Sequence, residues 1–344
     1  MTFRNTTPKE QQDVRQLLRA VFKAKDDAPF LNDQHLHWKY YAERIDWAGS
    51  RSFVLSEDAR LAAHACVWPI GVLLNEKKIE GFHPIDWAAN SGVRGTGARL
   101  LREMQKLTEI SVCVGGTAVA RKVIAKTGYR PSGEMKYYAR PLRPWLQART
   151  HQRRNLKLPA RFARNWLWAM RWPATASPDW NAERVAPEQI PPEMLPVSSG
   201  RVTACVRNAA LFGYVEQCPI ARHELYVARD RSRLKGYFLL SFVPGQARVA
   251  DAWVNGGEIH EWEALYRLAV KTALDARNVA EVTAAAALEA GQHALTRCGF
   301  RMYQALPVML FDPKRLLAGA PPVHWQMIDN DFSFLHQGRP EYTT

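Results

Sequence analysis

The stretch Gly81–Leu101 reads GFHPIDWAANSGVRGTGARLL and decides the fold. Its first half alternates as a strand does, and its second half has helical spacing after a turn that contains Gly95 and Gly97. A helix that begins directly after a strand leaves N–H groups without partners, and these groups attract phosphate. The two glycines would allow the backbone to approach a phosphate closely. The alternative interpretation is a glycine turn that only connects a strand to a helix.

The same order of elements surrounds this stretch and occurs a second time along the 344-residue chain. Periodicity in the first half predicts strands at 2–4, 52–56, 61–68, 72–74, 79–87, 110–114 and 135–140, and helices at 98–107 and 118–127. Periodicity in the second half predicts strands at 224–228, 235–242, 248–254, 279–284 and 303–310, and helices at 262–275 and 287–297.

Two short matches indicate an internal duplication at the scale of a domain. Lys126-Thr127-Gly128-Tyr129 and Arg297-Cys298-Gly299-Phe300 each end a predicted helix before a strand, with glycine just beyond the last turn. We therefore expect an α/β protein with mixed sheets. Its predicted parts are a first domain at 1–144, a basic linker rich in Trp and Pro at 145–196, a second domain at 197–318 and a tail at 319–344.

The order strand, glycine turn, helix, strand, helix, Gly-aromatic pair and strand resembles the GCN5-related N-acetyltransferase (GNAT) superfamily. In that family the turn holds Gln or Arg, two residues, Gly, one residue and then Gly or Ala, and it binds the pyrophosphate of acetyl-coenzyme A. Here Gly92, Gly95 and Gly97 occupy the first, fourth and sixth positions, so the first departs from the pattern. The resemblance covers residues 2–140 and implies two tandem GNAT-like domains, the second degenerate, with acetyl-CoA or another acyl-CoA as co-substrate and no metal.

A finer similarity is to a double-GNAT group found near bacterial polysaccharide-assembly genes. The residues that carry it are His37-Trp38-Lys39-Tyr40, Gly115-Gly116-Thr117, Arg140-Pro141-Leu142-Arg143-Pro144 and Trp325 with Asp329-Asn330-Asp331. This similarity implies acyl transfer to an amine of an amino sugar or a related cell-envelope precursor, as a small molecule or in lipid-linked form.

Candidate site residues lie on the strand before the turn and in the turn itself. An acceptor amine must lose a proton before it attacks a thioester, so we predict Asp86 or His83 as the group that handles this proton. Strict alternation places the two side chains on opposite faces, unless Pro84 marks a bulge. The predicted cofactor-binding residues are Trp87, Ala88, Arg94, Gly95, Thr96, Gly97, Ala98 and Arg99.

Two further features depart from an active GNAT enzyme. Many members place a general-acid Tyr four residues before the glycine of the Gly-aromatic pair, where this chain has Ile124 and Leu295. In the second half the turn reads Asn255-Gly256-Gly257-Glu258, and its carboxylate would repel a pyrophosphate. We therefore expect the second domain to have lost coenzyme binding and to shape the acceptor cleft.

The positive charge is concentrated between Met135 and Pro178. This stretch holds ten of the 47 Lys and Arg residues and none of the 33 Asp and Glu residues. Within it, 145–172 interleaves Arg with Trp, a combination suited to an anionic membrane surface. A solvated linker and a nucleic-acid contact are the alternatives, and nucleic acid is the least favoured of the three.

Composition is that of a globular protein, with 47% apolar and 23% charged residues. The five cysteines have neither metal-ligand nor redox spacing, and the N-terminus lacks the apolar region of a secretory signal. These features predict buried thiols and a cytoplasmic protein, with peripheral contact at the inner face of the membrane as a further option.

The sequence as a whole favours an acyl-CoA-dependent N-acyltransferase. A module that binds coenzyme A or a sugar without catalysis is the first alternative, because the Tyr acid and the usual first residue of the turn are missing. An aminoacyl-tRNA-dependent transferase is the second alternative, because tandem GNAT halves also occur in such enzymes.

Overall fold

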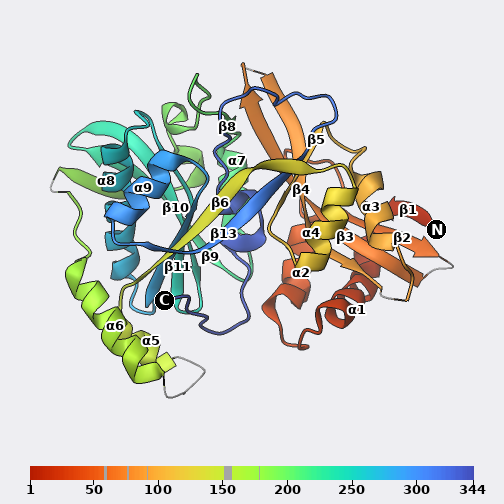
Figure 1. The fold of residues 1–344 in the computed structure, drawn as a ribbon, viewed down its shortest axis with the longest axis horizontal. Helices are drawn as coiled ribbons and strands as arrows, with labels where there is room; N and C mark the ends of the chain where they lie inside the picture. The colour runs from red at the N-terminus through yellow and green to blue at the C-terminus, as the bar shows by residue number, and fades with distance from the viewer. Residues whose placement is uncertain (58–59, 76, 91, 151–156, 178) are drawn as a thin grey trace. The chain divides into compact units, whose positions relative to one another are not determined.

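The computed structural model describes all residues except 58–59, 76, 91, 151–156 and 178, and its chain forms two compact units (Figure 1). The first unit comprises Met1–Glu134, Val197–Val206 and Leu306–Val323. The second unit comprises Met135–Pro196, Arg207–Ala305 and His324–Thr344. Each unit is therefore assembled from separate segments of the chain.

The first unit is built on a mixed sheet that begins with β1 (Thr2–Asn5), β2 (Ser52–Glu57), β3 (Arg60–Leu74), β4 (Lys77–Ala89) and β5 (Ile110–Val114), in that spatial order. Neighbouring strands are antiparallel except for β4 and β5, which are parallel. The last residues of β13 (Arg301–Phe311) complete the sheet by pairing with β5. The short β8 (Ala204–Cys205) pairs with β3.

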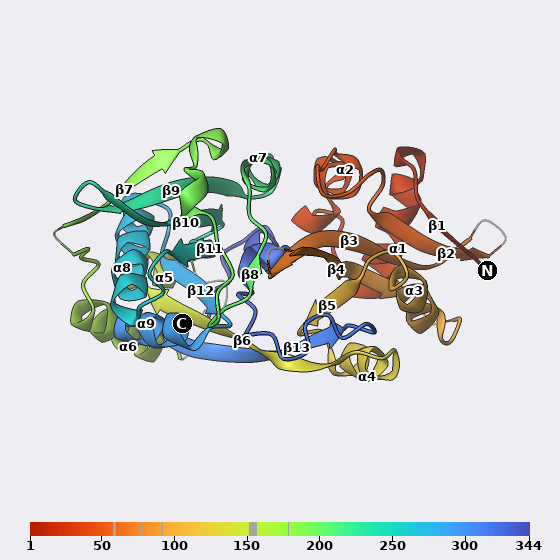
Figure 2. The ribbon, with the colours of Figure 1, turned by 90° about the horizontal axis from the view of Figure 1, so that it is seen from above.

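Helices cover both faces of this first sheet. In Figure 2, α2 (Asp33–Tyr41) lies on one side of β3 and β4, and α3 (Thr96–Met104) lies on the other. Leu100 and Met104 of α3 pack into a fully buried cluster with side chains of β2, β3 and β4. The remaining helices are α1 (Gln11–Phe22) and α4 (Ala118–Lys126).

The second unit repeats this sheet with β7 (Trp180–Val185), β9 (Arg222–Asp230), β10 (Arg233–Val243), β11 (Gln246–Val254) and β12 (Glu281–Ala286). Here β11 and β12 are the parallel pair, and the last residues of β6 (Arg130–Pro141) complete the sheet beside β12. Its helices are α5 (Pro144–Thr150), α6 (Leu158–Arg171), α7 (Ala209–Glu216), α8 (Ile259–Asp275) and α9 (Glu289–Arg297). The matching strand order confirms the predicted mixed α/β architecture with a repeated half.

Three details differ from the sequence prediction. The strands expected at 61–68 and 72–74 form one continuous strand, because β3 stays paired with β4 through Pro69. The Pro-rich stretch contains β7, an edge strand whose polar, partly exposed residues give no apolar alternation. The compact units also differ from contiguous ranges, since 135–144 lies in the second unit while 197–206 and 306–318 lie in the first. The ranges proposed for the domains remain a prediction about the duplicated halves.

All five cysteines are buried and none is in a disulfide, as their apolar contexts predicted. Burial raises the pKa of the Cys66, Cys113 and Cys298 thiols to about 12, so these groups are poor nucleophiles. In the part of the chain that the structure describes, no helix is both long and apolar enough to cross a bilayer.

Helix α2 is fixed to the first unit by a buried arginine. Arg51 has no exposed surface and donates hydrogen bonds to the carbonyl oxygens of Trp38 (2.9 Å), Lys39 (3.0 Å) and Ala42 (2.7 Å). These carbonyls belong to the C-terminal turn of α2, where no intrahelical N–H reaches them. Arg51 therefore holds in place the helix that carries Lys39 and Tyr40.

We predict that Arg51→Met lowers the local stability of the first unit by about 3 kcal/mol, because buried carbonyls lose charged donors. Hydrogen exchange of peptides from α2 and β4 measures this loss. The matched control is Arg60→Met, at an exposed position of the same unit. Equal protection in both variants would contradict the role given to Arg51.

Candidate active site between β4 and β5

The parallel strands β4 and β5 separate soon after they meet. Their paired residues are Gly81 with Ile110 and Phe82 with Ser111. Beyond Ser111, the strand β5 stays paired only on its other side, where β13 follows it as far as Val114. The β4–β5 ladder therefore ends early, and we call this interruption toward the carboxyl ends of the two strands the gap. Ligands bind at the carboxyl ends of the strands in many open α/β sheets.

His83 lies at the start of this gap. Its Nε2 accepts a hydrogen bond of 3.0 Å from the backbone N–H of Val114, a donor that has left the β4–β5 ladder. Because Nε2 accepts, the proton of the neutral ring is on Nδ1, and Nδ1 has no partner among the described residues. Burial lowers the pKa of His83 to about 4, so the ring is neutral at pH 7. In this state His83 is a hydrogen-bond donor and a weak base.

Asp86 occupies a β-bulge. Cys66 of β3 pairs with Ile85 while His64 pairs with Ala88, so Asp86 and Trp87 together face one residue of β3. Asp86 has φ of 50°, in the left-handed region that Asp tolerates better than most residues. The bulge that the sequence allowed at Pro84 lies instead two residues later, and Pro84 remains paired with Val67.

The Asp86 carboxylate is paired with a buried lysine. Lys39 Nζ lies 2.5 Å from Oδ2, and the Tyr40 hydroxyl donates to the same oxygen over 2.7 Å. The side chains of Lys39 and Asp86 are 1% and 5% exposed. Burial, and then the charge of Asp86, raises the pKa of Tyr40 well above its usual value, so Tyr40 stays a donor. This arrangement favours Asp86 as a group that holds the bulge; its predicted role as a base remains to be tested.

His64 fixes the backbone of the bulge from β3. Its Nδ1 donates to the carbonyl oxygen of Asp86 over 3.2 Å, and its Nε2 lies 2.9 Å from the Ser52 hydroxyl. Burial lowers the pKa of His64 to about 4. Both the side chain and the carbonyl of Asp86 are therefore held by buried neighbours.

The predicted phosphate turn joins β4 to α3. Gly95 is the N-cap of α3 with φ of 83°, a conformation that favours glycine. The Trp87 indole N–H donates to the carbonyl of Gly97 over 3.2 Å. A Cβ on Gly97 would lie 3.3 Å from the Cβ of Ala89, so glycine allows α3 to approach β4 closely. The predicted helix at 98–107 is present, but it begins two residues earlier, at Thr96, so Gly97 lies inside its first turn.

The other predicted cofactor residues are spread over this turn and the end of β4. Arg94 and Arg99 are exposed, and the Arg99 guanidinium donates to the carbonyl of Met1 over 3.1 Å. Ala98 is partly exposed in the first turn of α3, whereas the side chain of Thr96 is buried with its hydroxyl on the Val93 carbonyl. Ala88 is buried opposite His64, which leaves only its backbone for a ligand.

The equivalent parallel pair in the second unit has a longer ladder. Strands β11 and β12 stay paired over four residues, from Gln246 with Glu281 to Val249 with Ala284. At the start of α8, the Glu261 carboxylate lies where a Cβ on Gly256 would be, and Lys235 pairs with it at 3.0 Å. A carboxylate already occupies the helix N-terminus that a phosphate would need.

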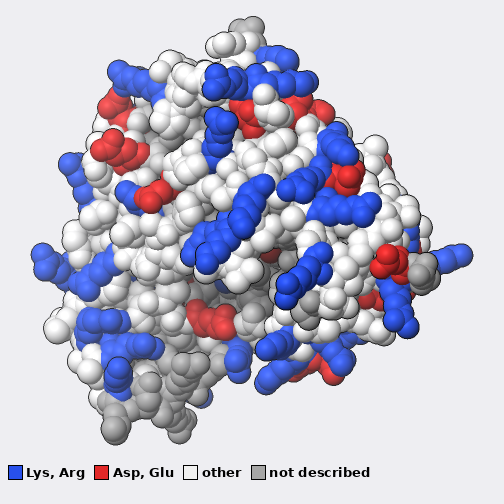
Figure 3. Space-filling model, turned by 45° about the vertical axis from the view of Figure 1, so that its right-hand side comes forward, with Lys and Arg blue, Asp and Glu red and all other residues white. Residues whose placement is uncertain are grey.

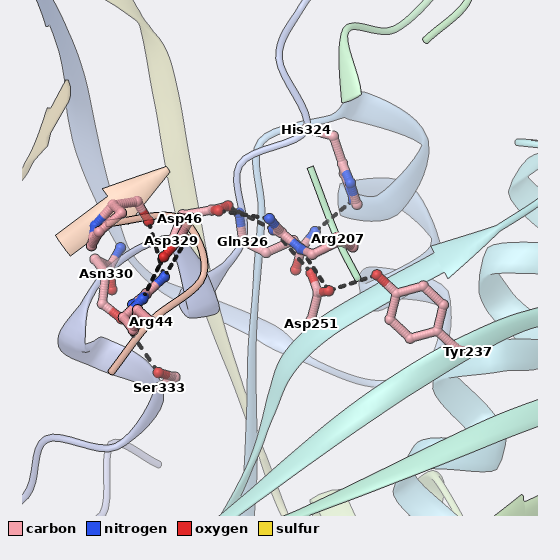
Figure 4. Close-up of polar contacts among 11 residues, drawn as sticks. Arg44, Asp46, Arg207, Tyr237, Asp251, His324, Gln326, Asp329, Asn330 and Ser333 are labelled. Carbon is pink, nitrogen blue, oxygen red and sulfur yellow. Dashed lines mark hydrogen bonds and ion pairs between the residues drawn. The ribbon is translucent and has the colours of Figure 1, made fainter. Parts of the chain in front are cut away.

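A buried ion-pair network joins the fourth strand of the second unit to the segment after residue 324 (Figure 4). Arg207 Nε lies 2.8 Å from Asp251 Oδ2, and its Nη1 lies 2.9 Å from Asp329 Oδ1. Tyr237 donates to Asp251 over 2.6 Å. His324 packs on the rings of Trp253 and Trp262, at centroid distances of 5.1 and 5.7 Å. Asp329 and His324 thus join the tail segment of the second unit to Arg207 and to Trp253 of β11.

Solved structures with the same fold identify the architecture. Yeast (Saccharomyces cerevisiae) N-myristoyltransferase, solved with bound myristoyl-CoA and inhibitors, aligns with a TM-score of 0.62 at 14% identity over 99% of this chain and 86% of that one. The chain has the GNAT fold. A GCN5-related N-acetyltransferase from Anabaena variabilis gives 0.57 at 10% identity over 90% and 72% of the two chains, and one from Kribbella flavida gives 0.51 at 13% over 90% and 70%. By sequence, no family model and no curated protein matches.

Within this GNAT fold, Lys39 and Tyr40 are the site residues whose roles sequence reasoning missed. Both stood in the quoted motif His37-Trp38-Lys39-Tyr40, but without an assigned role. The available signal was a lysine in a short aromatic helix, and it did not indicate a partner in β4.

We predict that Lys39→Met destabilises the first unit of this GNAT fold by about 3–5 kcal/mol, because it leaves the buried Asp86 carboxylate without its cation. The double variant Lys39→Met/Asp86→Asn should recover most of the loss. Urea denaturation measures both, with the exposed Lys78→Met as control. A double variant that is no more stable than Lys39→Met would contradict the pairing.

We predict that the stability of the folded chain depends on pH through His83. Its folded pKa of about 4 lies below the ordinary value of 6.5, so the unfolded chain binds the proton first, and stability falls as pH drops from 6.5 to 4. His83→Asn, which keeps an acceptor for Val114, should remove up to about 3 kcal/mol of this fall. The control is the exposed His37→Asn, and urea unfolding at several pH values supplies the measurement. Parallel pH profiles for His83→Asn and wild type would exclude this contribution.

Proposed function

We propose that the chain is an acyl-CoA-dependent N-acyltransferase whose acyl donor binds the first unit. The observation that carries this proposal is the gap between β4 and β5, which ends at a helix start shaped by Gly95 and Gly97. The likeness to N-acyltransferase structures, one of them with bound myristoyl-CoA, supports the same class of reaction.

The pyrophosphate of the donor would lie at the start of α3. The N–H groups of Thr96, Gly97 and Ala98 lie in the first turn, where helical N–H groups lack intrahelical partners. The exposed Arg94 and Arg99 add positive charge beside them. The pantetheine arm would then extend along β4 into the gap.

Transfer would proceed by direct attack. The acceptor nitrogen forms a bond to the thioester carbon, the carbon–sulfur bond breaks, and coenzyme A leaves as the thiolate, which takes up a proton. The amine proton passes to Asp86, to His83 or to water. Because Asp86 is ion-paired and His83 is a weak base, we favour water as the proton acceptor, with the His83 Nδ1–H as a donor to the bound acyl-CoA. Orientation of the two substrates can supply much of the rate.

We propose the amine of an amino sugar or related cell-envelope precursor as acceptor, on the basis of the double-GNAT resemblance. A non-catalytic module that holds coenzyme A is the second candidate. It is favoured by the buried Ile124 at the place of the usual Tyr acid and by the engaged Asp86 carboxylate. Binding without turnover would distinguish the module from the enzyme.

We predict that calorimetry detects acyl-CoA binding to the wild type and that Gly97→Glu weakens it by at least about tenfold, because a carboxylate repels the pyrophosphate. Acetyl-CoA and myristoyl-CoA are both titrated, since the length of the acyl chain is open. Arg94→Glu/Arg99→Glu, at exposed positions, tests the same site without affecting packing.

Gly92→Ala is the matched control, because a Cβ there meets only the Asn90 side chain at 3.4 Å. Release of free thiol with amine acceptors then reports turnover, and His83→Ala should reduce it. No binding by a folded wild type would overturn the proposal, and equal binding by Gly97→Glu would move the donor to another site.

A further inference from the structure

Helix α6 exposes an apolar face to solvent. Trp166, Leu167 and Met170 are 48%, 67% and 65% exposed, and they share one side of the helix by their spacing. The opposite side is buried and includes a polar residue, Asn165, which donates to the Gln147 side chain over 2.9 Å. An ordinary surface helix has the reverse distribution, with its apolar stripe toward the core.

Helix α5 extends this face. Trp145 is 68% exposed, and its ring centroid lies 6.3 Å from that of Phe162, which lies 5.7 Å from that of Trp166. In Figure 1 the two helices lie next to each other at the margin of the second unit. We call the exposed Trp145, Trp166, Leu167 and Met170, together with the half-buried Phe162, the α5–α6 surface.

Basic side chains border the α5–α6 surface. Arg149, Arg164 and Arg171 are exposed, and none of the three has an ion pair in the described part of the chain. Partial burial and the neighbouring charges of Arg161 and Arg301 lower the pKa of Arg164, which indicates a local excess of positive charge. Figure 3 shows basic side chains dispersed over one face of the molecule, where they outnumber the acidic ones.

We propose that the α5–α6 surface binds the surface of an anionic lipid bilayer. The 14-residue α6 would lie in the plane of the interface, with Trp166, Leu167 and Met170 among the lipid chains and Arg164 and Arg171 at the headgroups. Aromatic residues at the level of the headgroups are typical of such contacts. This inference goes beyond the proposed acyl transfer and does not depend on it.

The residue types of the α5–α6 surface favour a lipid bilayer over nucleic acid, and a charge test distinguishes a bilayer from a protein partner. Nucleic acid would use stacking aromatics and central cations, whereas here Leu167 and Met170 are central and the arginines lie at the border. A protein partner or a second copy would also cover apolar residues, but neither would respond to the headgroup charge of a lipid vesicle.

Flotation with vesicles of phosphatidylcholine alone, or mixed with phosphatidylglycerol, tests the proposal on the full chain. We expect binding to the anionic vesicles, weakened by salt, and at least about tenfold weaker binding for Leu167→Glu/Met170→Glu. Arg164→Glu/Arg171→Glu should lose the preference for anionic lipid. The matched control is Val119→Glu on α4, where a valine is 72% exposed.

Three outcomes would overturn the proposal. One is absence of binding to anionic vesicles, and another is equal flotation of Leu167→Glu/Met170→Glu and wild type. The third is a dimer in sedimentation equilibrium that this double variant dissociates, which would make the surface an interface between copies. Activity toward a soluble amine is measured on the same variants, so that failure of acyl transfer and failure of membrane binding are distinguished.

Discussion

The buried ion pair between Lys39 and Asp86 is the interaction on which the first unit's site depends. Asp86 has a backbone conformation that is unfavourable for most residues, and such a conformation persists only where its surroundings determine it. Lys39 and Tyr40 hold its carboxylate, while His64 holds its carbonyl. Because Arg51 fixes the end of α2, the bulge is determined by contacts from both a helix and a neighbouring strand. The same bulge directs the end of β4 toward the start of α3.

The second unit holds an aspartate on its sheet by a similar set of contacts. Arg207 and Tyr237 hold Asp251 on the fourth strand of that sheet, as Lys39 and Tyr40 hold Asp86. A second carboxylate, from Asp329, shares the arginine and binds the tail segment to the sheet. Glu261 also covers the helix start, and the parallel ladder continues over four residues. The duplicated framework therefore persists, while the helix start of the second unit is occupied by the chain's own carboxylate.

Local patterns in the sequence predicted the local parts of this structure. The helix start at Gly95, the strand at 110–114 and the repeated order of elements all follow from periodicity and glycine placement within short windows. The position of the bulge could not be predicted, because Asp86 is held by Lys39 and Tyr40, more than 40 residues earlier in the chain. Strand β7 was missed because an exposed edge strand has little apolar alternation. The position of the bulge thus depends on contacts between residues distant in sequence, which periodicity does not predict.

The gap between β4 and β5 depends on a strand from the other end of the chain. Val112, Cys113 and Val114 have left the ladder with β4, so their remaining strand pairing comes from Leu310, Met309 and Val308 of β13. Without β13 these residues would have no ladder on either side, and a strand in that state is unstable because its backbone groups lack partners. In the second unit β6 pairs with β12 in the same way. Each half of the chain thus completes the other half's sheet with the end of its last long strand.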